Sequence, residues 1–135
     1  MSRIIKILIV EDSPAMRQLL TLAVKKRPNV EVAEAGDGLA ALKLLSASHY
    51  DLLLMDLNMP ILDGMKLIKR VRESETAQPN AASSSHDQRV RIAIITTESA
   101  QATEDQARAL GADFFLRKPV SRRDIDKLLS EAFGA

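Results

Sequence analysis

Short, almost unbroken apolar runs recur along the chain. The clearest are residues 4–10 (IIKILIV), 52–55 (LLLM) and 92–95 (IAII). Each run is too short for a buried helix and does not alternate with polar residues, which is typical of strands covered on both faces of a sheet. Residues 30–35 alternate in part and suit a strand nearer the sheet edge, and residues 114–116 predict a fifth strand.

Amphipathic helical patterns separate these runs. Ser13 can cap and Pro14 can open the first helix, which Pro28 ends. The second helix begins at Asp37 or Gly38. The predicted inner faces are Met16, Leu19, Leu20, Ala23 and Val24 in the first helix, Ala41, Leu42 and Leu45 in the second, and Gly64, Leu67, Ile68 and Val71 in the third.

The last two helices differ in character. The fourth, from about Ser99 to Leu110, consists mostly of alanine and polar residues, so we expect it to bury little apolar area and to be the least firmly packed. The fifth begins at Ser121 as N-cap, with Asp124 in the capping-box position. Its predicted inner face is Ile125, Leu128, Leu129 and Ala132.

Strand and helix therefore alternate five times, which predicts a doubly wound α/β fold, (βα)5, with a parallel sheet and helices on both faces. With 135 residues, 46% of them apolar, we expect one domain over residues 1–135. Residues 74–89 have no periodicity and predict a long polar loop between the third helix and the fourth strand, at the opposite end of the sheet from the strand carboxyl ends.

The composition limits the possible binding partners and the cellular compartment. The formal net charge is only +1, so nothing in the charge balance indicates nucleic acid or an anionic membrane as a partner. The absence of cysteine excludes a disulfide framework and a thiolate metal site, and it agrees with a reducing compartment. No apolar stretch approaches the roughly 20 residues of a membrane-spanning helix, and Lys6 interrupts the first apolar run, unlike a signal peptide. We expect a cytoplasmic protein.

Polar residues gather where the predicted strands end. In open parallel sheets, ligands bind outside the carboxyl ends of the strands. Three carboxylates at that edge would repel one another unless a cation were present, and an oxygen-rich, sulfur-free site favours Mg²⁺. The candidates are Glu11 and Asp12 after the first strand, Asp56 after the third, Thr96 and Thr97 after the fourth, and Lys118 after the fifth.

Given such a metal, Asp56 has the chemistry of a nucleophile. An aspartate carboxylate can accept a phosphoryl group as an acyl phosphate while Mg²⁺ bridges acceptor and phosphoryl oxygens. Lys118 and Thr96 would supply the remaining charge and hydrogen bonds. Asp56 is thus chemically suited to accept a phosphoryl group.

These residues, in this order, resemble the receiver domains of bacterial two-component response regulators. The resemblance rests on Glu11-Asp12, residues 56–64 (DLNMPILDG), Thr96 and Lys118-Pro119, and it covers essentially the whole chain. It implies a flavodoxin-like sheet with strand order 2-1-3-4-5. It also implies that Asp56 is the phosphoacceptor and that a sensor histidine kinase or a histidine phosphotransfer protein is the donor.

The same resemblance assigns the metal ligands and the residue that contacts phosphate. Asp12 and Asp56 are expected to bind Mg²⁺ directly, Glu11 through water, and Asn58 through its backbone carbonyl. Lys118 is expected to contact the phosphoryl oxygens, with a cis peptide bond to Pro119 that orients it.

A switch is implied as well. Thr96 would move toward the phosphoryl group, and Phe115 holds the position of the switch aromatic residue. The implied output face, which would bind an unknown downstream protein, consists of the fourth helix, the fifth strand and the fifth helix. The chain departs from the usual pattern in having Phe rather than Tyr at position 115, and in Thr97, which is bulkier than the alanine or glycine common there.

Asn58 and Glu98 occupy the positions that modulate autodephosphorylation in this family. The pair resembles chemotaxis receivers with short-lived phosphoryl groups. We therefore hypothesise fast self-dephosphorylation.

Three classes of function stay in view. The leading hypothesis is a signalling switch that promotes its own phosphorylation and dephosphorylation without turning over a separate substrate. A phosphohydrolase or phosphotransferase is the chief rival, but such enzymes commonly place a second acid two residues after the nucleophile, where this chain has Asn58. The third is an interaction domain that is never phosphorylated, and the complete set of acids, together with Thr96 and Lys118, argues against it. The cognate kinase, the target, the oligomeric state, the role of the 74–89 loop and the choice between a stand-alone protein and a fragment stay open.

Overall fold

The five strands form one parallel sheet. A computed structural model describes residues 3–57, 64–76, 89–97 and 101–134, and the fold is built from these residues. In the described part the strand order is β2-β1-β3-β4-β5, so the predicted doubly wound fold and its strand order are confirmed. The strands are β1 Ile5–Val10, β2 Val30–Ala35, β3 Leu52–Asp56, β4 Arg91–Thr96 and β5 Phe114–Arg117.

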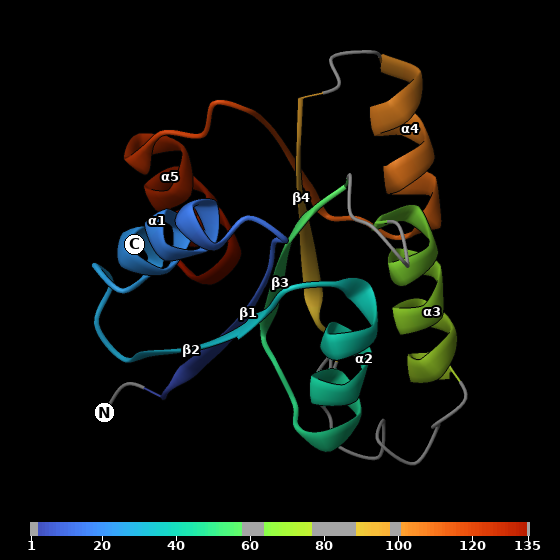
Figure 1. The fold of residues 1–135 in the computed structure, drawn as a ribbon, viewed down its shortest axis with the longest axis horizontal. Helices are drawn as coiled ribbons and strands as arrows, with labels where there is room; N and C mark the ends of the chain where they lie inside the picture. The colour runs from blue at the N-terminus through green and yellow to red at the C-terminus, as the bar shows by residue number, and fades with distance from the viewer. Residues whose placement is uncertain (1–2, 58–63, 77–88, 98–100, 135) are drawn as a thin grey trace.

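Helices cover both faces of the sheet. Figure 1 shows α1 and α5 on one face and α2, α3 and α4 on the other. Each face has its own cluster of buried apolar side chains, which we call the α1–α5 core and the α2–α4 core. The helices are α1 Pro14–Val24, α2 Gly38–Ala47, α3 Gly64–Thr76, α4 Gln101–Leu110 and α5 Arg122–Phe133.

Strands β1 and β3 are central, and their side chains alternate between the two cores. Ile7 and Ile9 belong to the α1–α5 core, whereas Leu8 and Val10 belong to the α2–α4 core, and all four are fully buried. Burying such a side chain contributes about 1.5–3 kcal/mol. The apolar run of residues 4–10 therefore contains a strand covered on both faces, as the sequence predicts.

The predicted helix starts are confirmed by side-chain caps. The Ser13 side chain accepts a hydrogen bond from the Met16 backbone N–H, and Asp37 accepts one from Ala40. At α5 both hydrogen bonds of the capping box between Ser121 and Asp124 are present. No helix in the described part of the chain is long and apolar enough to cross a membrane.

The predicted inner face of α1 is wrong at one position. Leu19 is 62% exposed, while Leu20 and Val24 are buried. The helix is rotated so that Arg17 and Thr21 lie toward β2, where both bind the Glu34 carboxylate. Polar contacts at the edge of the sheet thus displace Leu19 from the core.

One predicted boundary also differs. The 74–89 loop begins later than predicted, because α3 continues to Thr76. Glu75 holds this last turn, since its carboxylate accepts hydrogen bonds from Arg72 and from the Val90 backbone N–H. Residues 77–88 of the loop, and Ser99 at the expected start of α4, lie outside the described residues.

Helix α4 has the weak apolar face that the sequence predicts. Of the residues in α4, only Ala107 is buried. Its carboxyl end is held instead by polar contacts from α3. The Arg72 guanidinium donates to the Gly111 carbonyl, at 2.8 Å from Nη2, to the Val90 carbonyl at 2.7 Å, and to Asp113 at 2.9 Å.

Gly111 is required at this junction. Its φ of +125° is one that residues with side chains rarely adopt, and an added Cβ would lie 2.7 Å from the Arg72 Cγ. The tight turn after α4 and the packing of Arg72 therefore depend on each other.

We predict that Arg72→Met lowers the free energy of unfolding by about 2–3 kcal/mol, because it leaves partly buried carbonyls and carboxylates without their charged donor. Arg108→Met is the matched control. Arg108 is 45% exposed, pairs with Glu104 on the same helix and makes an exposed hydrogen bond to the Asp113 carbonyl, so its loss should cost less than about 1 kcal/mol. Urea unfolding measures both, and equal losses would contradict the structural importance of Arg72.

Candidate functional site

Three carboxylates meet at the carboxyl ends of two neighbouring strands. Glu11 and Asp12 follow β1, and Asp56 ends β3. The two strands are paired in register, Val10 opposite Met55, so their ends lie side by side. One oxygen from each carboxylate lies within 4.8 Å of the others.

Lys118 brings a cation to this cluster from the end of β5. Its Nζ lies 3.1 Å from Asp56 Oδ2, a hydrogen-bonding distance, and 3.6 Å from Glu11 Oε1. Burial lowers the pKa of the ammonium, but the hydrogen bond and charge of Asp56, with help from Glu11, outweigh burial and raise the pKa overall. Lys118 is therefore fully charged at neutral pH.

The backbone positions Lys118. Its N–H donates to the Thr96 carbonyl at 2.8 Å, which continues the pairing of β5 with β4. The peptide bond to Pro119 is cis.

Glu11 is the most deeply buried of the three acids, with only 2% of its surface exposed. Its Oε2 accepts a hydrogen bond from the Ser13 N–H at 3.1 Å, whereas Oε1 accepts none from the described residues. Burial raises the pKa of Glu11, and the negative charge of Asp56 adds to the rise. A raised carboxyl pKa means that ionised Glu11 destabilises the folded state at neutral pH.

This donor set fits a hard divalent cation. All its candidate ligand atoms are carboxylate oxygens, and the Glu11 carboxylate has one oxygen, Oε1, that accepts no hydrogen bond from the described residues. Among the described residues, Lys118 is the cation that pairs with these three acids, and one positive charge does not balance three carboxylates. An oxygen-binding cation such as Mg²⁺ would relieve that repulsion.

The other predicted site residues are distributed as follows. Thr96 is fully buried at the end of β4, and Thr97 beside it is exposed. Phe115 is half-buried on β5 and packs against the α2–α4 core. Asn58 and Glu98 lie outside the described residues.

Gly64, the last residue of the motif that begins at Asp56, is needed for close packing. Its N–H donates to the Leu57 carbonyl at 3.0 Å. A Cβ at position 64 would lie 2.7 Å from the Leu57 Cα. Helix α3 can therefore start against the end of β3 only with glycine at this position.

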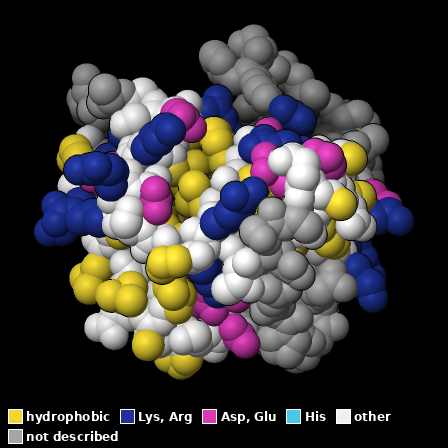
Figure 2. All heavy atoms as spheres, turned by 90° about the horizontal axis from the view of Figure 1, so that it is seen from above, with side chains coloured by type: hydrophobic (Ala, Val, Ile, Leu, Met, Phe, Trp, Pro, Cys, Tyr) yellow, Lys and Arg dark blue, Asp and Glu magenta, His cyan; other side chains and the backbone are white. Residues whose placement is uncertain are grey.

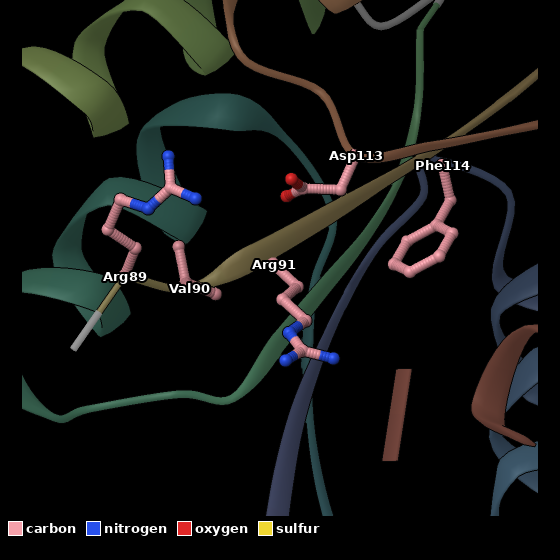
Figure 3. Close-up of a pocket in the computed structure, with 5 residues that line it drawn as sticks. All are labelled: Arg89, Val90, Arg91, Asp113 and Phe114. Atoms are coloured by element: carbon pink, nitrogen blue, oxygen red, sulfur yellow. The ribbon is translucent and has the colours of Figure 1, made fainter. Parts of the chain in front are cut away.

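Two surface hollows lie away from the carboxylates. A pocket of about 320 Å³ lies at the start of β4. Figure 3 shows Arg91 and Asp113 among the residues that line it. Arg91 is already engaged there, since it donates to the Ala132 carbonyl and lies over the Phe133 ring. A second hollow of about 200 Å³ lies between α4, β5 and α5 and is lined by Phe115, Leu128 and charged residues.

Charges of both signs are interspersed on the surface. On the face seen in Figure 2, basic and acidic side chains are both exposed, and hydrophobic side chains form groups between them. This agrees with a formal net charge of +1.

Sequence comparison places the chain in a family. The family model described as the response regulator receiver domain matches residues 7–130 of the sequence. The chain therefore belongs to the receiver domains of two-component signalling, which are phosphoryl-accepting switches.

Individual relatives agree with this assignment. A probable chemotaxis protein CheY of Rhizobium etli is 30% identical over 131 residues, which cover 97% of this chain and 94% of the relative. The structure of the chemotaxis response regulator CheY4 of Vibrio cholerae superposes with a TM-score of 0.80 at 28% identity, covering 96% of this chain and 99% of that one.

Receivers also occur in larger proteins and complexes. The chain is 30% identical over 123 residues to a protein-glutamate methylesterase of Rhodospirillum centenum, but spans only 28% of its length. The receiver domain of Ssk1 from Saccharomyces cerevisiae, solved with the histidine phosphotransfer protein Ypd1, gives a TM-score of 0.85 at 26% identity, covering 95% of this chain and 88% of that one.

Sequence reasoning missed one residue beside the site. Arg17 donates to the Glu11 backbone carbonyl at 2.8 Å. The available signal was its position, because residues 17, 20, 21 and 24 share one face of a helix. A charged residue on the same helix face as the buried Leu20 and Val24 indicates that it has a polar partner on the sheet against which the helix packs.

We predict that Glu11→Gln raises the free energy of unfolding by about 0.5–2 kcal/mol when divalent cations are removed with EDTA, since it relieves a charge that the fold disfavours. Glu31→Gln, at an exposed position on β2, is the control and should change stability by less than about 0.5 kcal/mol. Thermal or urea unfolding at pH 7 measures both. A clear loss of stability in Glu11→Gln would show that the attraction between Glu11 and Lys118 outweighs the repulsion.

Proposed function

We propose that this chain is a phosphorylation-activated switch that takes a phosphoryl group on Asp56 from a sensor histidine kinase or a histidine phosphotransfer protein. The observation that carries the proposal is the position of Asp56, which is 4% exposed, 3.1 Å from the Lys118 ammonium and beside two further carboxylates. The solved complex of a receiver with a phosphotransfer protein supports this class of donor.

In the transfer step, an Asp56 carboxylate oxygen forms a bond to phosphorus. The bond from phosphorus to the imidazole nitrogen of the donor phosphohistidine breaks, and the nitrogen keeps the electron pair. Lys118, held by its backbone bond to Thr96, contacts the phosphoryl oxygens and offsets their charge. The product is an acyl phosphate.

Asp12 and Asp56 are the proposed direct ligands of Mg²⁺, with Glu11 acting through water and the Asn58 backbone carbonyl completing the protein ligands. When bound, Mg²⁺ supplies positive charge that lets a carboxylate approach an anionic phosphoryl group. The oxygen-only donor set and the Glu11 oxygen that lacks a donor among the described residues support this assignment.

The proposed output runs from Thr96 to the face formed by α4, β5 and α5. Thr96 is buried at the end of β4 and Phe115 is half-buried on β5, beside the hollow between these elements. Movement of Thr96 toward the phosphoryl group would let Phe115 turn inward and change the affinity of this face for a downstream protein. A ligand or modification shifts such an equilibrium only through a difference between the two states.

The remaining parts of the proposal concern context. We place the chain in the cytoplasm, as a single receiver domain over residues 1–135. It acts without turnover of a separate substrate, although some relatives join a receiver to an enzyme.

We predict that acetyl phosphate adds one phosphoryl group to the protein, only in the presence of Mg²⁺, and that Asp56→Asn abolishes the adduct. Asp51→Asn is the matched control, because Asp51 is also buried and immediately precedes the same strand, at its opposite end. Its adduct should match the wild type. Intact-mass spectrometry, with circular dichroism to verify folding, measures all three proteins.

The alternatives give different results in this experiment. An interaction domain that is never phosphorylated would show no adduct in folded wild-type protein. A phosphohydrolase would release phosphate continuously from p-nitrophenyl phosphate. A phospho-form that persists for hours with Mg²⁺ would contradict fast self-dephosphorylation.

We predict that Thr96→Val keeps phosphorylation of Asp56 but loses its transmission to β5, because the side chain keeps its shape without the hydroxyl. The amide NMR signals of Phe115 and Leu116 should change their chemical shift when the wild type is phosphorylated. In the variant, the change on phosphorylation should be at most about a quarter as large. Unchanged transmission in the variant would exclude the Thr96 hydroxyl as the coupling group.

A further inference from the structure

Arg17 links the acidic end of β1 to the edge of the sheet. From α1, its Nη1 donates to the Glu11 backbone carbonyl at 2.8 Å, and its Nε donates to Glu34 Oε1 on β2 at 3.1 Å. We propose that Arg17 is a positioning residue of the metal site. By fixing the orientation of the peptide group between Glu11 and Asp12, it sets the affinity of the site for Mg²⁺. This inference rests on the proposed function.

The contact with the Glu11 carbonyl controls more than one residue. A peptide bond is planar, so the Glu11 C=O and the Asp12 N–H turn together. A donor that fixes this carbonyl therefore also fixes the plane in which the Asp12 N and Cα atoms lie, and with it the point from which the Asp12 side chain extends. The two acids that Arg17 orients in this way are both in the carboxylate cluster.

Two further contacts hold the chain on either side of this peptide bond, one at Glu11 and one at Ser13. The Glu11 N–H donates to the Ala35 carbonyl at 3.0 Å, and the Ser13 N–H donates to Glu11 Oε2. Asp12 is exposed. The carboxylates on either side of the Glu11–Asp12 peptide repel each other and Asp56, so the turn needs a restraint at the carbonyl between them.

Arg17 itself is held in place. Its side chain is 23% exposed, and the carboxylate of its partner Glu34 also accepts a hydrogen bond from the Thr21 hydroxyl at 3.2 Å. The planar guanidinium can donate to a carbonyl and a carboxylate at once, which a single ammonium does far less well. The rotation of α1 that leaves Leu19 exposed brings Arg17 and Thr21 into reach of Glu34.

The charge of Arg17 acts in the opposite direction from its position. A cation near a metal site disfavours metal binding, so charge alone predicts tighter Mg²⁺ binding after its removal. Glu34 pairs with the guanidinium and offsets most of its charge, and a partly exposed pair is further screened by solvent. We therefore expect the positional effect to dominate.

The test is a Mg²⁺ titration of the whole chain followed by ¹⁵N–¹H NMR, since the protein has no tryptophan to report binding by fluorescence. Arg17→Met should weaken Mg²⁺ binding about tenfold, the usual effect of losing an outer partner of a metal site. Arg17→Lys keeps the charge but not the simultaneous hydrogen bonds to the Glu11 carbonyl and to Glu34. Its dissociation constant for Mg²⁺ should lie between those of Arg17→Met and the wild type.

Arg27→Met is the matched control. Arg27 also donates to a backbone carbonyl, that of Phe133, at 3.4 Å, but it lies outside the carboxylate cluster. Its Mg²⁺ dissociation constant should equal that of the wild type. At saturating Mg²⁺ the phosphorylation rate of Arg17→Met should return to within about twofold of the wild type, because Asp56 and Lys118 are unchanged, whereas general damage to the fold would lower the rate at every Mg²⁺ concentration.

The outcomes separate this inference from the function on which it rests. An unchanged or tighter Mg²⁺ affinity in both Arg17 variants would overturn the positioning role. A wild-type protein that binds no Mg²⁺ would overturn the proposed metal site, and the inference with it. Weaker binding in both Arg17 variants, together with recovery of the rate at high Mg²⁺, would establish the positioning role.

Discussion

The site depends on mutual repulsion among three carboxylates that the parallel sheet brings to one edge. Parallel pairing of β1 with β3 places Glu11 and Asp56 at adjacent strand ends, and burial removes the water that would otherwise screen them. Lys118 neutralises only part of this charge. The folded protein thus keeps an excess of negative charge at the point where a cation and a phosphoryl group would bind.

Such a site is tolerable because the rest of the sheet is strongly stabilised. The central strands bury almost every side chain on both faces, while the charged residues sit at strand ends, where backbone groups can hold them. Lys118 is placed by pairing with Thr96, and the turn after β1 by Ala35, Ser13 and Arg17. The repulsion is therefore opposed by backbone geometry that packing of the core fixes.

Much of this arrangement follows from the sequence, for physical reasons that differ between residues. Apolar runs predict buried strands because no other element of that length is covered on both faces, and strand ends then identify Glu11, Asp56 and Lys118. Alternation of strands and helices implies a parallel sheet, but the strand order came from the family resemblance. The orientation of α1 was predicted wrongly at Leu19, which fits the apolar period. The contacts of Arg17 and Thr21 with Glu34 favour a different rotation of the helix, and the position of Arg17 on the helix was the one sequence signal for them.

The contacts of α4 suggest how a local charge change can reach a distant surface. A helix that buries only one of its residues, Ala107, depends little on the core, yet its carboxyl end is fixed by Arg72 through Gly111 and Asp113. Its amino end follows the strand that carries Thr96. With the carboxyl end anchored and little apolar packing along its length, we expect displacement in the proposed switch to be easiest at the amino end of α4. The output face can then respond to phosphorylation while the sheet, which holds the carboxylates together, stays unchanged.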